Sequence, residues 1–256
     1  MRLSILQTAL HWENADANRA MFSSLLEPLA GRTDLVLLPE MFTTGFSMRA
    51  ADLAEPMDGP TVRWMREQAN RLGGALAGSF ICRENDRFYN RLVFMRPNGQ
   101  LDLYDKRHLF GLAQEHETYT PGQERRVVEW LGWRICPLVC YDLRFPVWSR
   151  NNAAEKFDLL LYVANWPSRR SHHWRALLPA RSIENQCFTA GVNIVGADGN
   201  GFEYTGDSSI IDYSGLHRCQ ISGQEGAFTA KLSLDELRHF RQQLPFLEDA
   251  DAFSLA

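Results

Sequence analysis

Short apolar runs and longer amphipathic stretches alternate along the whole chain. Apolar runs that are rich in β-branched and aromatic residues and bounded by turn residues predict β-strands. We expect strands at residues 2–7, 35–38, 75–81, 89–96, 101–104, 126–130, 133–137 with its continuation 138–142, 159–163, 187–193, 208–212 and 227–232. A Pro97-Asn98-Gly99 turn joins two of them as a hairpin, and Gly132 turns another.

Amphipathic stretches predict helices at residues 14–29, 59–72, 145–154, 172–186 and 234–243. In the second of these, Val62, Met65 and Ala69 recur at the three- and four-residue spacing of one helix face. Residues 107–124 are polar, aromatic and irregular, and we expect a loop near a functional site. Strands, hairpins and helices interleave without a linker or repeat, so the pattern predicts one domain, 1–256, of mixed α/β class. Two helix-covered sheets packed back to back would bury both faces of each sheet.

Composition narrows the class of protein. The 256 residues are 45% hydrophobic and 23% charged, as in ordinary globular domains. A net charge of -4 without a basic stripe argues against nucleic acid or an anionic membrane as the main partner. No apolar run approaches the roughly 18 residues of a membrane span, and no signal peptide is expected. Five cysteines at irregular spacing favour neither a disulfide framework nor a zinc site, so we expect a reducing cytoplasm and no metal.

Three predicted strands end in an ionisable residue. Residues 35–39 lead to Glu40, residues 101–105 lead to Lys106, and residues 133–139 lead to Cys140. Lysine is rare in this arginine-rich chain, which makes Lys106 conspicuous. Because strand ends in α/β folds meet at a common edge, we expect these side chains to form a nucleophilic site.

Each of these residues also has a purely structural interpretation. Alone, Glu40 would cap a turn, Lys106 would be an exposed edge charge, and Cys140 would be a small buried side chain. That structural interpretation suffices for Cys82, Cys136, Cys187 and Cys219. Cys140 differs because a polar turn and a predicted helix beginning near Pro146 follow at once, and a helix N-terminus stabilises a thiolate.

Pro39-Glu40, the run Tyr-Asp-Lys-Arg-His-Leu-Phe at 104–110 and the run Cys-Tyr-Asp-Leu-Arg-Phe-Pro at 140–146 resemble the three signature segments of the nitrilase, or carbon–nitrogen hydrolase, superfamily. Residues 180–186 are similar to the long helix that follows the nucleophile in that superfamily. Order and spacing match over nearly the whole chain. Within the superfamily, the segments most resemble those of the omega-amidases, which hydrolyse the terminal amide of 2-oxo acid amides such as 2-oxoglutaramate.

The resemblance implies a four-layer α-β-β-α sandwich and a homo-oligomer, for which we expect a homodimer. It implies Glu40 as general base, Lys106 as the essential lysine and Cys140 as the nucleophile. For the second glutamate of the superfamily, Glu115 fits better than Glu117, although spacing alone leaves both open. The implied reaction releases ammonia from a small-molecule amide through a thioester, without a cofactor. We expect the Tyr141 backbone N–H to join Lys106 in binding the oxyanion.

Aromatic residues and arginines in or near these segments are the candidates for substrate contacts. Phe110, Tyr141 and Trp166 lie in or beside the signature segments and are predicted to bind substrate, although Trp166 fits a core or rim position equally well. A keto-acid carboxylate needs a cation, for which Arg169, Arg170 and Arg144 are candidates, unless Arg144 is a structural charge beneath Cys140. A nitrilase, an N-carbamoyl amino acid amidohydrolase or a general aliphatic amidase remain alternatives, as does a thiol redox sensor on the same fold.

Overall fold

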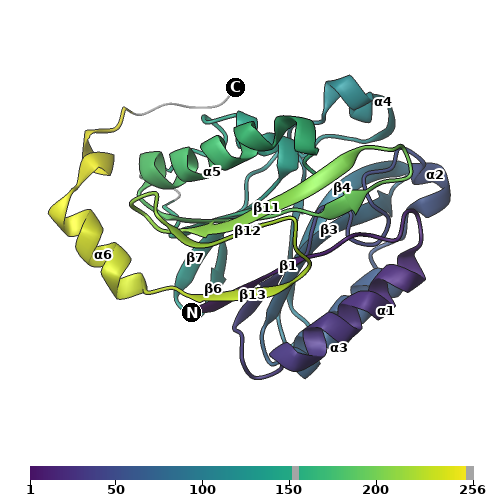
Figure 1. Ribbon diagram of the computed structural model, residues 1–256, viewed down its shortest axis with the longest axis horizontal. Coiled ribbons are helices and arrows are strands. Elements are labelled where there is room, and N and C mark those ends of the chain that lie inside the picture. Colours follow the sequence, from purple (N-terminus) through teal and green to yellow (C-terminus); the bar gives the residue numbers. More distant parts are fainter. Residues whose placement is uncertain (152–155, 252–256) are drawn as a thin grey trace.

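The computed structural model describes residues 1–151 and 156–251. It contains two mixed sheets with helices on their outer sides (Figure 1). The first sheet has the strand order β13-β1-β2-β3-β4-β5, with bounds Gly226–Lys231, Arg2–Gln7, Leu35–Leu37, Ala75–Glu84, Arg87–Met95 and Leu101–Asp105. The second has the order β10-β11-β9-β8-β7-β6, with β12 also paired to β11; the bounds are Val195–Ala197, Glu203–Ile211, Phe188–Val192, Leu159–Val163, Trp133–Val139, Val128–Trp130 and, for β12, His217–Ser222.

Alternating side chains on the first sheet serve two cores. Leu35 and Leu37 of β2 join a large core that also holds side chains from β7, β8 and β9, so it lies between the sheets. Val36 and Leu38 point the other way, into a core shared with α1 and α3. This period of two is the geometry of an extended strand, and here it separates two hydrophobic layers.

The helices cover the outer faces. α1 (Ala15–Leu26) and α3 (Pro60–Leu72) lie side by side on the first sheet, while α5 (Ser171–Asn185) lies across the strands from them and contacts β9 and β11 (Figure 1). α6 (Leu234–Gln243) buries Leu237 in the core between the sheets. Short helices complete the structure: α2 (Ala50–Leu53), α4 (Glu115–Thr118) and the 3₁₀ turns η1 (Glu27–Leu29), η2 (Gly111–Ala113), η3 (Cys140–Arg144), η4 (Ser168–Arg170) and η5 (Phe246–Asp249). The predicted four-layer α-β-β-α sandwich with mixed sheets is confirmed.

The helix predicted at 145–154 is wrong over the described part of that range. Residues 146–149 form turns after η3, and residues 152–155 lie outside the described residues. Packing explains the difference, because the Trp148 side chain is buried and donates from Nε1 to Tyr104 Oη at 3.0 Å. Asn151 Nδ2 donates to the Phe157 carbonyl and Asn151 Oδ1 accepts the Phe157 N–H, so side-chain contacts with a later segment fix the chain at this point. The sequence pattern also missed α2, β10 and β12.

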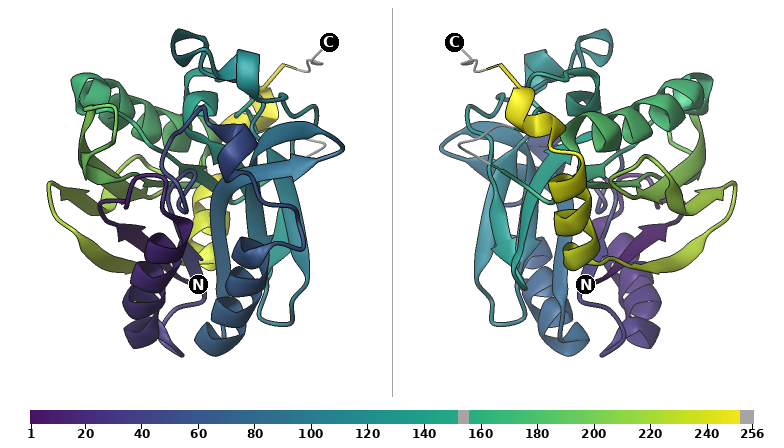
Figure 2. Two further views of the ribbon diagram at one scale, coloured as in Figure 1. Left: turned by 90° about the vertical axis from the view of Figure 1, so that its right-hand side faces the viewer. Right: turned by 90° about the vertical axis from the view of Figure 1, so that its left-hand side faces the viewer.

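The strand ends that carry the candidate residues lie at one end of the molecule. β1, β2 and β3 run parallel in one sheet, and β7, β8 and β9 run parallel in the other. Figure 2 shows α2 and α4, which follow β2 and β5 along the chain, at the same end above the sheets. None of the described helices is long and apolar enough to cross a membrane.

Candidate active site

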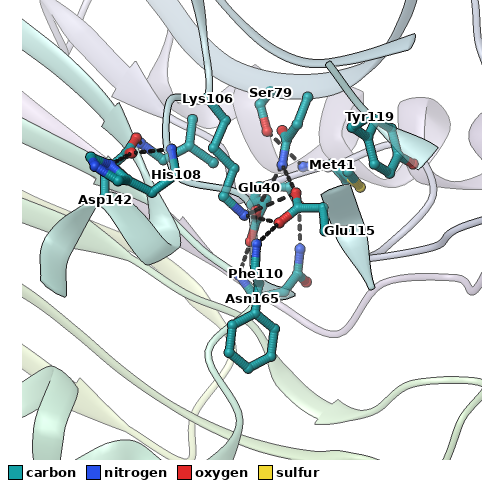
Figure 3. Close-up of polar contacts among 12 residues, drawn as sticks. Glu40, Met41, Ser79, Lys106, His108, Phe110, Glu115, Tyr119, Asp142 and Asn165 are labelled. Atoms are coloured by element: carbon teal, nitrogen blue, oxygen red, sulfur yellow. Dashed lines mark hydrogen bonds and ion pairs between the residues drawn. The ribbon is translucent and has the colours of Figure 1, made fainter. Parts of the chain in front are cut away.

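Glu40, Lys106 and Glu115 form a buried charge cluster (Figure 3). The Nζ atom of Lys106 lies 2.9 Å from Oε1 of Glu40 and 3.0 and 2.9 Å from the two oxygens of Glu115. Neither carboxylate is exposed to solvent, and Lys106 is 1% exposed. The structure therefore brings together three residues from separate segments of the chain, and it selects Glu115 over Glu117, whose side chain is exposed.

Local backbone contacts fix these side chains. Lys106 directly follows β5, and its N–H donates to the Asn90 carbonyl of the neighbouring strand at 3.0 Å. Glu115 begins α4 immediately after Gln114, whose φ of 55° is left-handed. The Gly122 N–H donates to the Lys106 carbonyl at 2.9 Å, closing the loop that carries Glu115. A Cβ at Gly122 would lie 2.0 Å from the Asp105 carbonyl oxygen, so only glycine permits this approach.

Two asparagines complete the hydrogen bonding of Glu40. Asn90 Nδ2 donates to Glu40 Oε1 at 2.8 Å and to Glu115 Oε1 at 3.4 Å. The Asn165 N–H donates to Glu40 Oε2 at 2.9 Å, and its Nδ2 donates to the Glu40 carbonyl at 2.5 Å. Sequence reasoning missed both residues. The position of Asn165 after the β8 strand was a usable signal, whereas nothing in the sequence distinguishes Asn90.

Cys140 occupies a sharp turn between β7 and η3. Its φ of 43° lies in the left-handed region, which a residue with a side chain adopts only when its surroundings impose it. The Asp142 carboxylate is one such constraint, because it accepts hydrogen bonds from the N–H of Val139 at 3.0 Å, the N–H of His108 at 3.0 Å and the hydroxyl of Tyr104 at 2.7 Å. Asp142 thereby ties the cysteine turn to the loop after Lys106. Sequence reasoning gave Asp142 and His108 no role.

The surroundings of the thiol differ from the sequence-based expectation. Burial and the negative charge of Glu40 hold the pKa of Cys140 well above its ordinary value, and the nearby Lys106 ammonium opposes this only in part. The expected stabilisation of a thiolate by a helix N-terminus is therefore outweighed. The side-chain hydrogen bond between the Cys140 thiol and Glu40 also favours the protonated thiol. Such a thiol needs a base at the moment of attack, and Glu40 is placed to be that base.

The charges of Lys106, Glu40 and Glu115 affect one another's pKa values. Although burial opposes an ammonium, Glu115 and Glu40 raise the pKa of Lys106 above its ordinary value. Burial raises the pKa of Glu115, Lys106 opposes that shift, and Glu40 adds to it. The two carboxylates therefore favour the ammonium form of Lys106, which lines the same cavity as Cys140 and can stabilise a developing oxyanion there.

A cavity of about 590 Å³ opens onto Glu40, Lys106 and Cys140. Phe110 and Trp166 line it, and Trp166 also belongs to the buried core between the sheets. Tyr141 is not among the lining residues; its ring packs edge-on against Phe110 at a centroid distance of 5.0 Å. Within residues 1–151 and 156–251, no group of three or more His, Cys, Asp or Glu side chains is arranged to hold a metal ion.

Comparison with known proteins places this geometry in a family. The sequence model of the carbon–nitrogen hydrolase family matches residues 2–242. The omega-amidase YafV of Yersinia enterocolitica is 48% identical over 100% of this chain and 98% of its own length. The 2-oxoglutaramate amidase of Bacillus subtilis is 33% identical over 96% of both chains. Among solved structures, the chain is similar to XC1258 from Xanthomonas campestris, a CN-hydrolase superfamily protein with an arsenic adduct in its active site. The two are 50% identical and superpose with a TM-score of 0.98, and the match covers 100% of this chain and 99% of XC1258. The chain belongs to the carbon–nitrogen hydrolase family.

Proposed function

We propose that this chain is an omega-amidase that hydrolyses the terminal carboxamide of small 2-oxo acid amides, such as 2-oxoglutaramate, to the acid and ammonia. One observation carries the mechanism: Lys106 is held between two buried carboxylates in the cavity that also contains Cys140. The substrate class is supported by the relatives named omega-amidase and 2-oxoglutaramate amidase, which match the chain over nearly its whole length.

The first half of the reaction forms a thioester. Glu40 accepts the proton of the Cys140 thiol while Sγ attacks the amide carbon. The carbonyl electrons move to oxygen, and the Lys106 ammonium and the Tyr141 N–H bind the oxyanion. One preorganised donor of this kind contributes about 3–4 kcal/mol to lowering the barrier. When the oxyanion collapses, the C–N bond breaks, Glu40 returns its proton to the leaving nitrogen, and ammonia departs.

The second half releases the acid. Glu40 removes a proton from water, and the hydroxide attacks the thioester carbon. After the second oxyanion collapses, the C–S bond breaks and the Cys140 sulfur recovers the proton from Glu40. Glu115 holds the ammonium of Lys106 in place throughout, and Asn90 holds Glu40 and Glu115 at a fixed separation.

Trapping the acyl-enzyme tests this proposal. Rapid acid quench of the enzyme with 2-oxoglutaramate, followed by mass measurement of the intact chain and its peptides, is expected to show the acyl group on the peptide containing Cys140. Cys140→Ala is expected to fold and release no ammonia, whereas Cys219→Ala, which changes a thiol of β12, keeps wild-type activity. Ammonia release by Cys140→Ala would refute the assignment of Cys140 as the nucleophile.

A substrate panel separates the alternatives within the family. Nitriles, N-carbamoyl amino acids, simple aliphatic amides and 2-oxoglutaramate are compared by kcat/KM from ammonia release. We expect 2-oxoglutaramate to give the highest value, and a nitrile or carbamoyl compound in first place would replace the proposed substrate. A thiol that is oxidised by peroxide but never acylated would instead indicate a redox sensor.

We also propose that the enzyme is a cytoplasmic homodimer. The oligomer is supported by the resemblance to the superfamily, and the compartment by the odd number of irregularly spaced cysteines. Light scattering on the purified protein is expected to give twice the chain mass of 29.3 kDa. A monomeric mass would refute the dimer, and recovery of the protein outside the cytoplasmic fraction would refute the location.

A further inference from the structure

Asn193 directly follows β9 and is 2% exposed, although it is not among the residues that line the cavity. The parallel pairing of β8 with β9 ends at Val163 and Val192, and one further bond joins the Ala164 N–H to the Val192 carbonyl at 2.9 Å. Trp166 lies beyond the end of β8 and is buried. Its backbone groups therefore need partners other than a neighbouring strand.

The Asn193 side chain supplies these partners. Its Oδ1 accepts the Trp166 N–H at 2.7 Å, and its Nδ2 donates to the Trp166 carbonyl at 3.0 Å. Nδ2 also donates to the Gly206 carbonyl of β11 at 2.8 Å. A carboxamide offers one acceptor atom and two N–H donors, and all three are engaged here. Asn193 therefore holds both backbone groups of Trp166 and ties them to β11.

Asn193 is itself fixed by buried residues. Its backbone N–H donates to Ser208 Oγ at 2.9 Å, and the Ser208 N–H donates to Gln7 Oε1 at 3.1 Å. Ser208 and Gln7 have no exposed surface. A Cβ at Gly206 would lie 2.2 Å from the Gln7 side chain, so only glycine lets Gln7 approach β11 this closely. The amide of Asn193 thus projects from an anchored backbone.

The residue before Trp166 holds the candidate base. The Asn165 N–H donates to Glu40 Oε2 at 2.9 Å, and Asn165 Nδ2 donates to the Glu40 carbonyl (Figure 3). The Asn165 carbonyl and the Trp166 N–H belong to one planar peptide group, so a bond that fixes the second also fixes the first. The contacts of Asn193 with Trp166 therefore restrain the Asn165 backbone that binds Glu40.

These contacts join the two sheets at the site. Glu40 follows β2 of the first sheet, whereas Cys140 follows β7 and Asn193 follows β9 of the second. Proton transfer from the Cys140 thiol requires a fixed position of Glu40 relative to the second sheet. The bonds from Asn193 through Trp166 and Asn165 to Glu40 provide such a link.

We propose that Asn193 is a positioning residue for the general base. It holds the peptide between Asn165 and Trp166 so that the Asn165 N–H keeps Glu40 aligned with the Cys140 thiol. The inference rests on the proposed role of Glu40 and adds the residue that sets its alignment. Because Asn193 does not line the cavity, it acts on the proton transfer and not on substrate binding.

Asn193→Ala is expected to lower kcat for 2-oxoglutaramate about 10- to 100-fold and to change KM less than about threefold, because the base is displaced while the cavity wall is kept. Steady-state ammonia release measures both constants. Ser208→Ala removes the acceptor of the Asn193 N–H and should cause a smaller loss of kcat, again without a change in KM.

Asn151→Ala is a matched control. Asn151 is also 2% exposed, and its amide makes the same set of bonds: Oδ1 accepts the Phe157 N–H at 3.1 Å, and Nδ2 donates to the carbonyls of Phe157 at 3.0 Å and Asn185 at 3.2 Å. Asn151→Ala and Asn193→Ala should lower the urea midpoint of unfolding by similar amounts. Only Asn193→Ala should lower kcat.

A double-mutant cycle separates positioning of the base from general damage. In a Glu40→Gln background the base is already absent, so adding Asn193→Ala should lower the residual kcat less than about threefold. A change that acts independently of Glu40 would multiply with Glu40→Gln. If Asn193→Ala does not fold, Ser208→Ala is taken through the same cycle with the same expected result.

Multiplied losses of kcat in the cycle, an unchanged kcat in Asn193→Ala, or equal losses of kcat in Asn193→Ala and Asn151→Ala would each overturn the inference. These outcomes leave the amidase mechanism intact as long as Glu40→Gln itself is impaired. Full activity of Glu40→Gln would instead refute the proposed role of Glu40.

Discussion

The Nζ atom of Lys106 contacts both carboxylate oxygens of Glu115, at 3.0 and 2.9 Å, with almost no exposure of either side chain. Glu115 Oε2 also accepts the Phe110 N–H at 2.5 Å. Glu115 thus joins the lysine to the backbone of the loop that lines the cavity. The consequences of this pairing can be measured separately for catalysis and for stability.

Glu115→Gln is expected to lower kcat about 10- to 100-fold, because the ammonium of Lys106 loses a charged hydrogen-bond partner and is held less firmly against the oxyanion. Steady-state ammonia release measures the change. Glu117→Gln provides the control, since Glu117 lies on the same short helix but is exposed. Equal losses in the two variants would contradict the distinction that the structure makes between them.

Lys106→Met is expected to lower the free energy of unfolding by about 3–5 kcal/mol near neutral pH, because it leaves two buried carboxylates without their cation. The pKa of Glu115 is already raised by burial and is lowered by Lys106, so removing the lysine raises this pKa further. A carboxyl group with a raised pKa in the folded state stabilises below its unfolded pKa and loses that contribution as pH rises through the folded value.

The deficit of Lys106→Met relative to wild type should therefore grow from acidic to neutral pH in urea unfolding experiments. The exposed pair of Arg238 and Asp235 offers a comparison, and Arg238→Met should cost about 0–1 kcal/mol at most. A deficit that is the same at pH 5 and pH 8 would show that the buried carboxylates are not its cause.

Glu40→Gln is expected to lower the pKa of Cys140 while it lowers kcat about 10²- to 10⁴-fold. The negative charge of Glu40 raises the thiol pKa, and Lys106 opposes it, so the neutral amide leaves the lysine dominant. Ultraviolet titration of the thiolate, taken as the difference from Cys140→Ser, measures the pKa without interference from the other cysteines. A Cys140 pKa that stays unchanged or rises in Glu40→Gln would contradict the interaction between Glu40 and the thiol. Full activity of this variant would refute the assignment of Glu40 as the general base.

Asp142→Asn is expected to lower kcat more than it raises KM. In the wild type, Asp142 accepts a hydrogen bond from the Val139 N–H. In the variant, the new amide nitrogen would face this N–H donor, and the turn at Cys140 would shift. The loss of buried hydrogen bonds should also cost about 1–3 kcal/mol of stability. Asp212→Asn changes another buried carboxylate, in the turn after β11, and should cost stability without changing kcat. Equal kinetic effects in both variants would indicate a merely structural role for Asp142.

Local pattern predicted a mixed α/β domain and the strand ends near which Glu40, Lys106 and Cys140 lie, whereas the resemblance to the nitrilase superfamily implied the four-layer sandwich and the roles of these residues. Leu35 and Leu37 alternate with Val36 and Leu38 as a strand buried on both faces requires. Lys106 and Cys140 directly follow β5 and β7, and Glu40 lies three residues after the end of β2. Glu115 was harder, because two glutamates share the loop and Glu115 is positioned by the left-handed Gln114 before it. A single chain with no structure cannot reveal that backbone conformation.

Other features depend on contacts between distant segments. Asn90 reaches Glu40 across 50 positions of sequence, and nothing near it in the chain indicates an active-site contact. The helix expected after Pro146 fails because Trp148 packs against Tyr104, which again lies far away in sequence. The thiol pKa was misjudged for the same reason, since a local turn favours the thiolate but the long-range burial and charge of Glu40 prevail.

The loop that Gly122 closes has an anchored part after Glu115 and an exposed part before it. Its bond to Lys106, together with the hydrogen bond from the Tyr119 hydroxyl to the Ser47 carbonyl at 2.5 Å, anchors the segment after Glu115 to the body of the protein. The segment before it, η2, carries Leu112, which is 86% exposed and lines the mouth of the cavity. Residues 111–113 can therefore be exchanged to widen or narrow the opening while the lysine and its carboxylates stay in position, so acceptance of new amides can be engineered independently of the chemical step.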